Sequence, residues 1–146
     1  MKKILAEDLV LLDERLAQIE GELFALGAEF NEAVNQSSET WHDNAPFDAA
    51  RDRQSIINYE RKKLVEIRLT ATKITTSKAK KIEIGKHVTL SSGLHVFIAG
   101  VWSGRDIVDG SKVILVDSPI ARALHGKKVG DTVTLLGGEV QVVAIR

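Results

Sequence analysis

The residues best suited to chemistry gather in one short stretch, SSETWHDNAPFDAARDRQS, at positions 37–55. Glu39 and Asp43 supply carboxylates, and His42 stands directly beside Asp43, which suggests a base–carboxylate pair of the kind used in proton transfer. Each residue also has a simpler interpretation. Asp43 precedes a predicted helix and could cap its free N–H groups, while a loop glutamate or histidine is commonly only solvated. Both interpretations stay open at this point.

Other site chemistries find little support in the sequence. The absence of cysteine excludes disulfides, thiolate zinc sites and cysteine nucleophiles. His87, His95 and His125 are scattered without metal-ligand spacing, and the GKK at 126–128 lacks the preceding glycine of a phosphate loop. Acids interrupt the N-terminal apolar residues, and no apolar run approaches the roughly 20 residues that span a bilayer. We therefore expect a soluble, cytoplasmic protein without membrane contact.

Charge divides the 146 residues into two halves. The whole chain holds 20 basic and 20 acidic residues, so its net charge indicates no partner. Residues 1–74 contain 10 bases and 14 acids, whereas residues 75–146 contain 10 bases and 6 acids. This asymmetry leaves room for a basic surface on the second half.

The first half has the hydrophobic period of a coiled coil. Its apolar residues recur at alternating steps of four and three, at Leu5, Leu9, Leu12, Leu16, Ile19, Leu23, Leu26, Phe30 and Ala33. That spacing predicts one helix of about 30 residues, on the order of 45 Å long. A second helix is expected from about Pro46 to Ile74, with a looser seam. The first helix is acidic and the second basic, which predicts an antiparallel hairpin with its tip at about 37–46.

The second half has the period of strands. Short β-branched runs separated by glycines occur at HVTL, LHVFIAGV, KVILVD, DTVTLL and EVQVVAIR. Between the third and fourth, Ser118 is a plausible helix N-cap, Pro119 suits the first helical position and Gly126 the end. We predict an α+β chain with a coiled coil over 1–75 and a small, mostly antiparallel sheet domain with one short helix over 76–146.

Residues 104–146 resemble the C-terminal domain of the bacterial transcript cleavage factors GreA and GreB, an FKBP-like sheet domain. The family pattern SPI-x-R-A-L-x-GK followed by GD falls on Ser118, Pro119, Ile120, Arg122, Ala123, Leu124, Gly126, Lys127, Gly130 and Asp131. The tip of the family's coiled coil reads close to GDLSENAEYHAAKERQ, which aligns without gaps to residues 39–54. Six positions are identical, namely Asn44, Ala45, Ala49, Ala50, Arg53 and Gln54. The resemblance covers nearly the whole chain.

The resemblance implies a monomeric accessory factor rather than an enzyme. Such a factor binds RNA polymerase, inserts its coiled coil into the secondary channel, and stimulates cleavage of the backtracked nascent RNA 3′ end. Its tip acids help the polymerase to hold a Mg²⁺ ion, and the factor has no cofactor of its own. The family's second acid falls on Asp43 and its first on Thr40, so Glu39, one residue earlier, is the remaining candidate. Arg51 and Arg53 would then face RNA.

The resemblance also assigns a docking surface to the short C-terminal helix. Arg122 and Lys127 are its candidates for contact with the polymerase, whereas Ile120 and Leu124 are expected in the core. Because Thr40 replaces an acid, a second function stays open: a related factor that occupies the channel without promoting cleavage. A third, a prolyl isomerase or peptide-binding module with the hairpin as a dimerisation arm, is disfavoured because residues 76–146 offer only Phe97 and Trp102 to an aromatic pocket.

Overall fold

The computed structural model describes residues 2–36 and 45–146, which form two compact units. One unit is the helical segment Leu12–Leu69, and the other joins the N-terminal residues up to Leu11 with Thr70–Arg146. The division expected at residue 75 therefore differs from the structural one, because residues at both ends of the range 1–75 pack with the sheet. The described part of the chain contains no helix long and apolar enough to cross a membrane.

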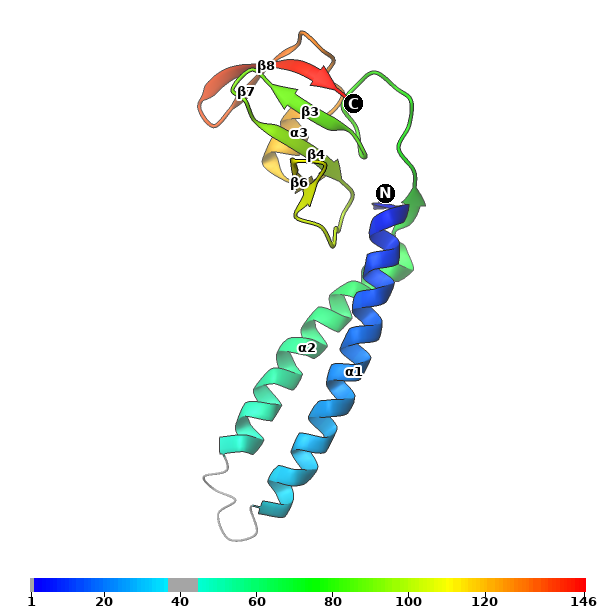
Figure 1. The fold of residues 1–146 in the computed structure, drawn as a ribbon, viewed down its shortest axis with the longest axis vertical. Helices are drawn as coiled ribbons and strands as arrows, with labels where there is room; N and C mark the ends of the chain where they lie inside the picture. The colour runs from blue at the N-terminus through cyan, green and yellow to red at the C-terminus, as the bar shows by residue number, and fades with distance from the viewer. Residues whose placement is uncertain (1, 37–44) are drawn as a thin grey trace. The chain divides into compact units, whose positions relative to one another are not determined.

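The hairpin consists of α1 (Ala6–Gln36) and α2 (Ala45–Thr70), which run side by side (Figure 1). Leu12, Ile19 and Leu26, alternate members of the predicted seam, are buried, and the seam residues between them are half-buried. On α2, Ala50 and Leu64 are buried in the same way. This is the pattern expected when one apolar stripe faces a single partner helix, and it confirms the predicted seam.

The first residue of the predicted seam and the last residues of the predicted second helix lie in strands rather than in helices. β1 (Lys3–Leu5) pairs in parallel with β2 (Thr72–Ile74), and Leu5 lies opposite Ile74. The expectation that Leu5 and Ile74 belong to the two helices is therefore wrong. Leu5 is fully buried, but against Phe97 and Ala99 of the sheet. An apolar residue in helical register does not reveal whether a helix or a sheet will cover it, and β-branched residues around position 72 favour extended backbone.

The main sheet has six strands in the order β5-β6-β4-β3-β8-β7. Their bounds are β3 His87–Leu90, β4 His95–Ala99, β5 Ile107–Val108, β6 Ser111–Leu115, β7 Thr132–Leu135 and β8 Gly138–Ile145. All neighbours are antiparallel except β4 and β6. A strand forms at each of the five predicted runs, which confirms a mostly antiparallel α+β domain.

The short helix α3 (Pro119–Leu124) begins and ends as predicted. The Ser118 hydroxyl accepts a hydrogen bond from the Ala121 backbone N–H at 3.3 Å, and Pro119 occupies the first turn. Gly126 follows the helix with a φ of 77°, a conformation that glycine adopts without strain. Leu124 is fully buried and Ile120 packs against the same core, as expected.

Strand β4 contributes to a core on each face of the sheet. Val96 and Ile98 pack into the core that includes α3, while Phe97 and Ala99 pack on the opposite face with Leu5. β1 reaches that face because Gly100 has no side chain. A Cβ there would lie 2.1 Å from the Lys3 carbonyl oxygen, which accepts a hydrogen bond from the Val101 N–H at 2.8 Å.

Candidate functional site

The segment with the predicted catalytic residues joins α1 to α2. Glu39, Thr40, His42 and Asp43 lie outside the described residues, so the roles assigned to Asp43 and Glu39 remain predictions. The structure does describe the helices that carry this segment. From Leu12 to Gln36, α1 extends for about 37 Å at 1.5 Å per residue.

An aromatic pair closes the hairpin at its described end. Phe30 of α1 and Phe47 of α2 meet edge to face, with ring centroids 5.3 Å apart and an interplanar angle of 74°. Such a pair contributes about 0.5–1.5 kcal/mol beyond its buried area. The pair therefore joins α1 to α2 toward the described end of the hairpin.

Ion pairs connect the helices along their length. The Arg15 guanidinium donates to both carboxylate oxygens of Glu60, at 2.8 and 2.6 Å, which lowers the pKa of Glu60 and raises that of Arg15. Three further pairs join α2 arginines to α1 acids, namely Arg53–Glu29, Arg61–Glu20 and Arg68–Asp13. Exposed pairs of this kind contribute about 0–1 kcal/mol each, so they define the register of the hairpin more than its stability.

The predicted RNA-facing residues are exposed but already engaged. Arg53 pairs with Glu29 across the hairpin, and Arg51 lies 3.7 Å from Asp48 one turn earlier in α2. Both arginine side chains keep more than half of their surface accessible. An RNA phosphate would therefore compete with a carboxylate at each of them, and their role stays a prediction.

The predicted docking residues of α3 differ in exposure. Arg122 is exposed on the helix, whereas Lys127 is half-buried just after it, and its carbonyl accepts a hydrogen bond from Ile82. No observation on the described residues tests their contact with a partner. The docking assignment therefore also stays a prediction.

A buried ionic cluster was missed by the sequence analysis. Asp8 in the first turn of α1 is fully buried, and its Oδ1 accepts hydrogen bonds from Ser103 Oγ at 2.8 Å and Arg105 Nε at 3.0 Å. The Arg105 guanidinium lies 5.4 Å from the centroid of the Phe97 ring. This cluster fastens the start of α1 to the loop after β4. Nothing in the local sequence distinguishes Asp8 from a solvent-exposed acid at a helix start.

The histidines do not form a catalytic or metal site among the described residues. His87 Nδ1 lies 3.2 Å from Ser111 Oγ, and its Nε2 lies 3.9 Å from Asp109. Burial lowers the pKa of His87, but Ser111 is only 3% exposed and is not accessible to a substrate. The described residues contain no group of three or more histidines and acids placed to hold a metal ion.

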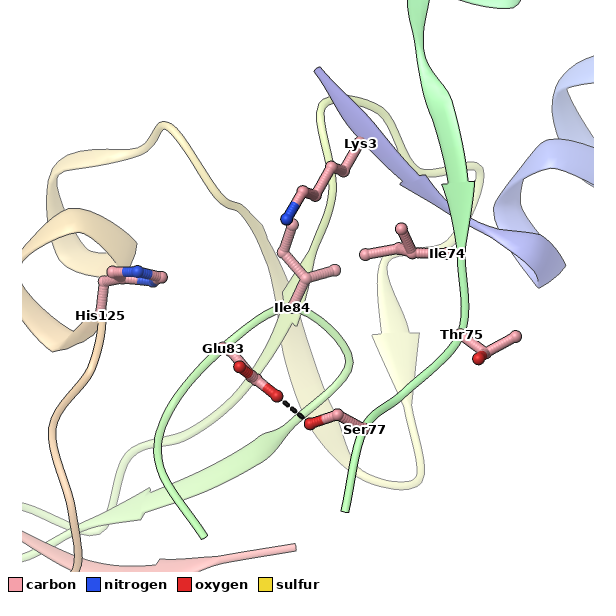
Figure 2. Close-up of a pocket in the computed structure, with 7 residues that line it drawn as sticks. All are labelled: Lys3, Ile74, Thr75, Ser77, Glu83, Ile84 and His125. Carbon is pink, nitrogen blue, oxygen red and sulfur yellow. Dashed lines mark hydrogen bonds between the residues drawn. The ribbon is translucent and has the colours of Figure 1, made fainter. Parts of the chain in front are cut away.

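A pocket of about 260 Å³ opens beside the β1–β2 pair (Figure 2). Ile74 and Ile84 line its apolar part, and the side chains of Lys3, Glu83 and His125 line its polar part. The sequence analysis did not identify this pocket, because 122 positions separate Lys3 from His125 and only the folded sheet brings them together.

Comparison with known proteins identifies the family. Residues 76–146 match the family described as "Transcription elongation factor, GreA/GreB, C-term". Transcription elongation factor GreA of Mycoplasma capricolum is 31% identical over 147 residues, which cover 90% of each chain. The GreA of Acidiphilium cryptum is 33% identical over 148 residues, covering 90% of this chain and 92% of its own.

A solved structure is similar over the same span. GreA factor homolog 1 (Gfh1) of Thermus thermophilus is 25% identical, with a TM-score of 0.49 over 99% of this chain and 98% of that one. The two GreA sequences carry the assignment, because their similarity extends through both the hairpin and the sheet domain. The chain belongs to the GreA/GreB family of transcription elongation factors.

Proposed function

We propose that this chain binds RNA polymerase, inserts its hairpin into the secondary channel and stimulates cleavage of backtracked RNA. Family membership supports polymerase as the partner. The observation that carries the proposal is the paired hairpin itself, in which a buried seam and cross-helix arginine pairs join the two long helices between which residues 37–44 lie in the sequence. A rod of this kind suits an accessory factor that delivers a few side chains to a distant active centre, in the cytoplasm and as a monomer.

Asp43 is the residue proposed to act on the polymerase active centre, with Glu39 as its partner. Carboxylate oxygens are the hard ligands that Mg²⁺ prefers, so this donor set fits an ion held jointly with the polymerase. When bound, paired metal ions stabilise the attacking and leaving oxygens of phosphodiester hydrolysis. The contribution of this chain is to position a carboxylate, while Arg51 and Arg53 would attract the RNA backbone.

A second function is favoured by one residue, Thr40. It stands where the resemblance places the first tip acid, and a hydroxyl group provides a weaker ligand for Mg²⁺ than a carboxylate. A factor with this tip could occupy the channel and inhibit transcription without stimulating cleavage. The two functions share the polymerase and the channel, and differ only at the tip.

RNA 3′-end cleavage in a backtracked elongation complex separates them. Wild type would be compared with Asp43→Ala, Thr40→Asp and the control Asp52→Ala, which removes an exposed acid from α2. Occupancy would be matched by competition with an established GreA. Cleavage that is lost only in Asp43→Ala supports the first function. Faster cleavage in Thr40→Asp than in wild type would show that the missing first acid limits the cleavage rate. Competition without cleavage establishes the channel-blocking function, and absence of competition refutes both.

A further inference from the structure

Hydrogen bonds within the protein hold one wall of the pocket beside the β1–β2 pair in place. Lys86, only 6% exposed, donates from its ammonium to the Ser77 carbonyl at 2.6 Å. Ser77 Oγ donates in turn to the Glu83 carboxylate, as Figure 2 shows, and Thr76 Oγ1 donates to the Gly85 carbonyl at 3.4 Å. Side-chain hydrogen bonds thus clamp residues 75–77 onto residues 83–86.

Backbone hydrogen bonds hold the other walls. Ile82 exchanges two with the end of α3, from its N–H to the Lys127 carbonyl and from the Gly126 N–H to its own carbonyl, both at 2.8 Å. The Lys3 carbonyl is held by the Val101 N–H. Lys3, Ile74 and His125 point toward the space beside Ile84 (Figure 2). A preformed pocket of this kind needs little ordering when it binds.

The segments that line the pocket are rich in lysine, and Lys3 lines the pocket itself. Glu83 is the only acid in residues 75–86 and 118–130, and Ser77 already occupies one of its oxygens. Besides the buried Lys86, the same segments contain five lysines that lie within a few residues of lining positions in the sequence, namely Lys78, Lys80, Lys81, Lys127 and Lys128. None of these lysines, nor Lys3, forms an ion pair with a described residue. The bordering Asp131 carboxylate accepts from the Lys128 backbone N–H at 2.8 Å rather than from a lysine ammonium.

We propose that this pocket binds a short peptide segment with an aliphatic side chain next to carboxylates. Ile74 and Ile84 would cover the aliphatic group, while the Lys3 ammonium pairs with an adjacent carboxylate. The lysines of the neighbouring segments would attract the remaining carboxylates. A nucleic acid fits less well, because no Phe, Tyr or Trp lines the pocket and His125 is the single lining side chain that could stack on a base. The source of the segment rests on the proposed function, which makes it an acidic stretch of RNA polymerase.

A peptide probe tests the pocket without the polymerase. The full chain, labelled with ¹⁵N, would be titrated with the capped peptide Ac-EELEE-NH2, with Ac-KKLKK-NH2 and with a hexamer of riboadenosine. We expect the first peptide alone to shift the amides of Ser77, Glu83 and His125. Lys3→Glu and Lys81→Glu should weaken it about tenfold, the effect of about 1.4 kcal/mol. The control Lys112→Glu, an exposed lysine of β6, should change affinity less than twofold.

Three results would overturn the pocket assignment: no shifts at these amides, equal shifts with the lysine peptide, or tighter binding of the oligonucleotide. Unchanged thermal unfolding of each variant excludes loss of fold as the cause of weakened binding.

The same variants, assayed by fluorescence anisotropy on core RNA polymerase, test the partner. Lys3→Glu should weaken that binding about tenfold and Lys112→Glu should not. If wild type fails to bind polymerase, the proposed function is refuted, and the peptide titration remains a separate test of the pocket. If Lys3→Glu leaves the affinity for polymerase unchanged, the acidic segment that occupies the pocket does not come from polymerase.

Discussion

Replacement of Arg105 by Met should destabilise the sheet-containing unit more than any conservative surface change. Asp8 is fully buried, so the loss of Arg105 leaves its carboxylate with a single donor, the Ser103 hydroxyl. Breaking a buried ion pair from one side costs about 3–5 kcal/mol. The methionine preserves much of the apolar stem that packs near Phe97, which limits the loss of packing.

Removal of the other partner by Asp8→Ala should lower the free energy of unfolding by less, about 1–3 kcal/mol. The Arg105 side chain is 25% exposed and can turn its charge toward water, an option that the buried carboxylate lacks. The pair is also imperfect, since Asp8 Oδ2 and Arg105 Nη2 are buried without a hydrogen-bond partner. The double variant should therefore resemble Asp8→Ala, so its loss of unfolding free energy should fall about 3–5 kcal/mol below the sum of the two single variants.

Urea unfolding followed by Trp102 fluorescence measures this cycle. Trp102 belongs to the sheet-containing unit and precedes Ser103, and a Trp41→Phe background removes the other tryptophan signal. Costs that add to within about 0.5 kcal/mol would refute the reasoning, because independent sites behave in that way. A cost below about 1 kcal/mol for Arg105→Met would show that the carboxylate is not held as a buried charge.

Three other predictions concern the glycine contact, a histidine and the hairpin register. Gly100→Ala should cost about 2–4 kcal/mol in chemical unfolding, because its Cβ would collide with the Lys3 carbonyl, whereas Gly138→Ala, with its nearest neighbour at 3.9 Å, should be nearly neutral. Burial lowers the pKa of His87 below its ordinary 6.5, so the unfolded chain binds the proton first and stability should fall as pH drops below about 6.5. Thermal unfolding between pH 7.5 and 5 should show this loss, reduced in His87→Gln. Glu29→Lys should lower hairpin stability by less than about 1 kcal/mol, and adding Arg53→Glu should restore it, as measured by helix circular dichroism.

Periodicity predicted most of the fold because it is a local property of the chain. The seam from Leu12 to Leu26 and the capped helix after Ser118 depend on neighbours within a few residues, and both are confirmed. The prediction of helix failed at Leu5 for the opposite reason, because the structure there depends on residues that are distant in the sequence. Leu5 continues the helical spacing, but its cover is Phe97, whose place beside it depends on the sheet and on a parallel pairing with β2.

The buried cluster and the pocket could not be predicted from local pattern. Asp8 and Arg105 are 97 positions apart, and an acid in the first turn of a helix is ordinarily explained by the helix dipole alone. The pocket needs β1, the segment 75–86 and the end of α3 together. The family's tip acids followed from resemblance, and their geometry lies outside the described residues.

Arginines and lysines have different roles in this chain. The cross-helix pairs Arg15–Glu60, Arg53–Glu29, Arg61–Glu20 and Arg68–Asp13 use arginine, whose rigid fork fixes a carboxylate in one geometry and so defines the register of the hairpin. Lys3, which lines the pocket, and the exposed lysines of the neighbouring segments form no ion pair with a described residue, and an ammonium on a flexible stem attracts from a distance. Added salt screens such attraction strongly, whereas the buried hydrophobic seam is not weakened by screening. Polymerase binding should therefore weaken between 50 and 300 mM salt, where the Debye length falls about 2.4-fold, while hairpin unfolding hardly changes. Equal salt sensitivity of the two would refute this division.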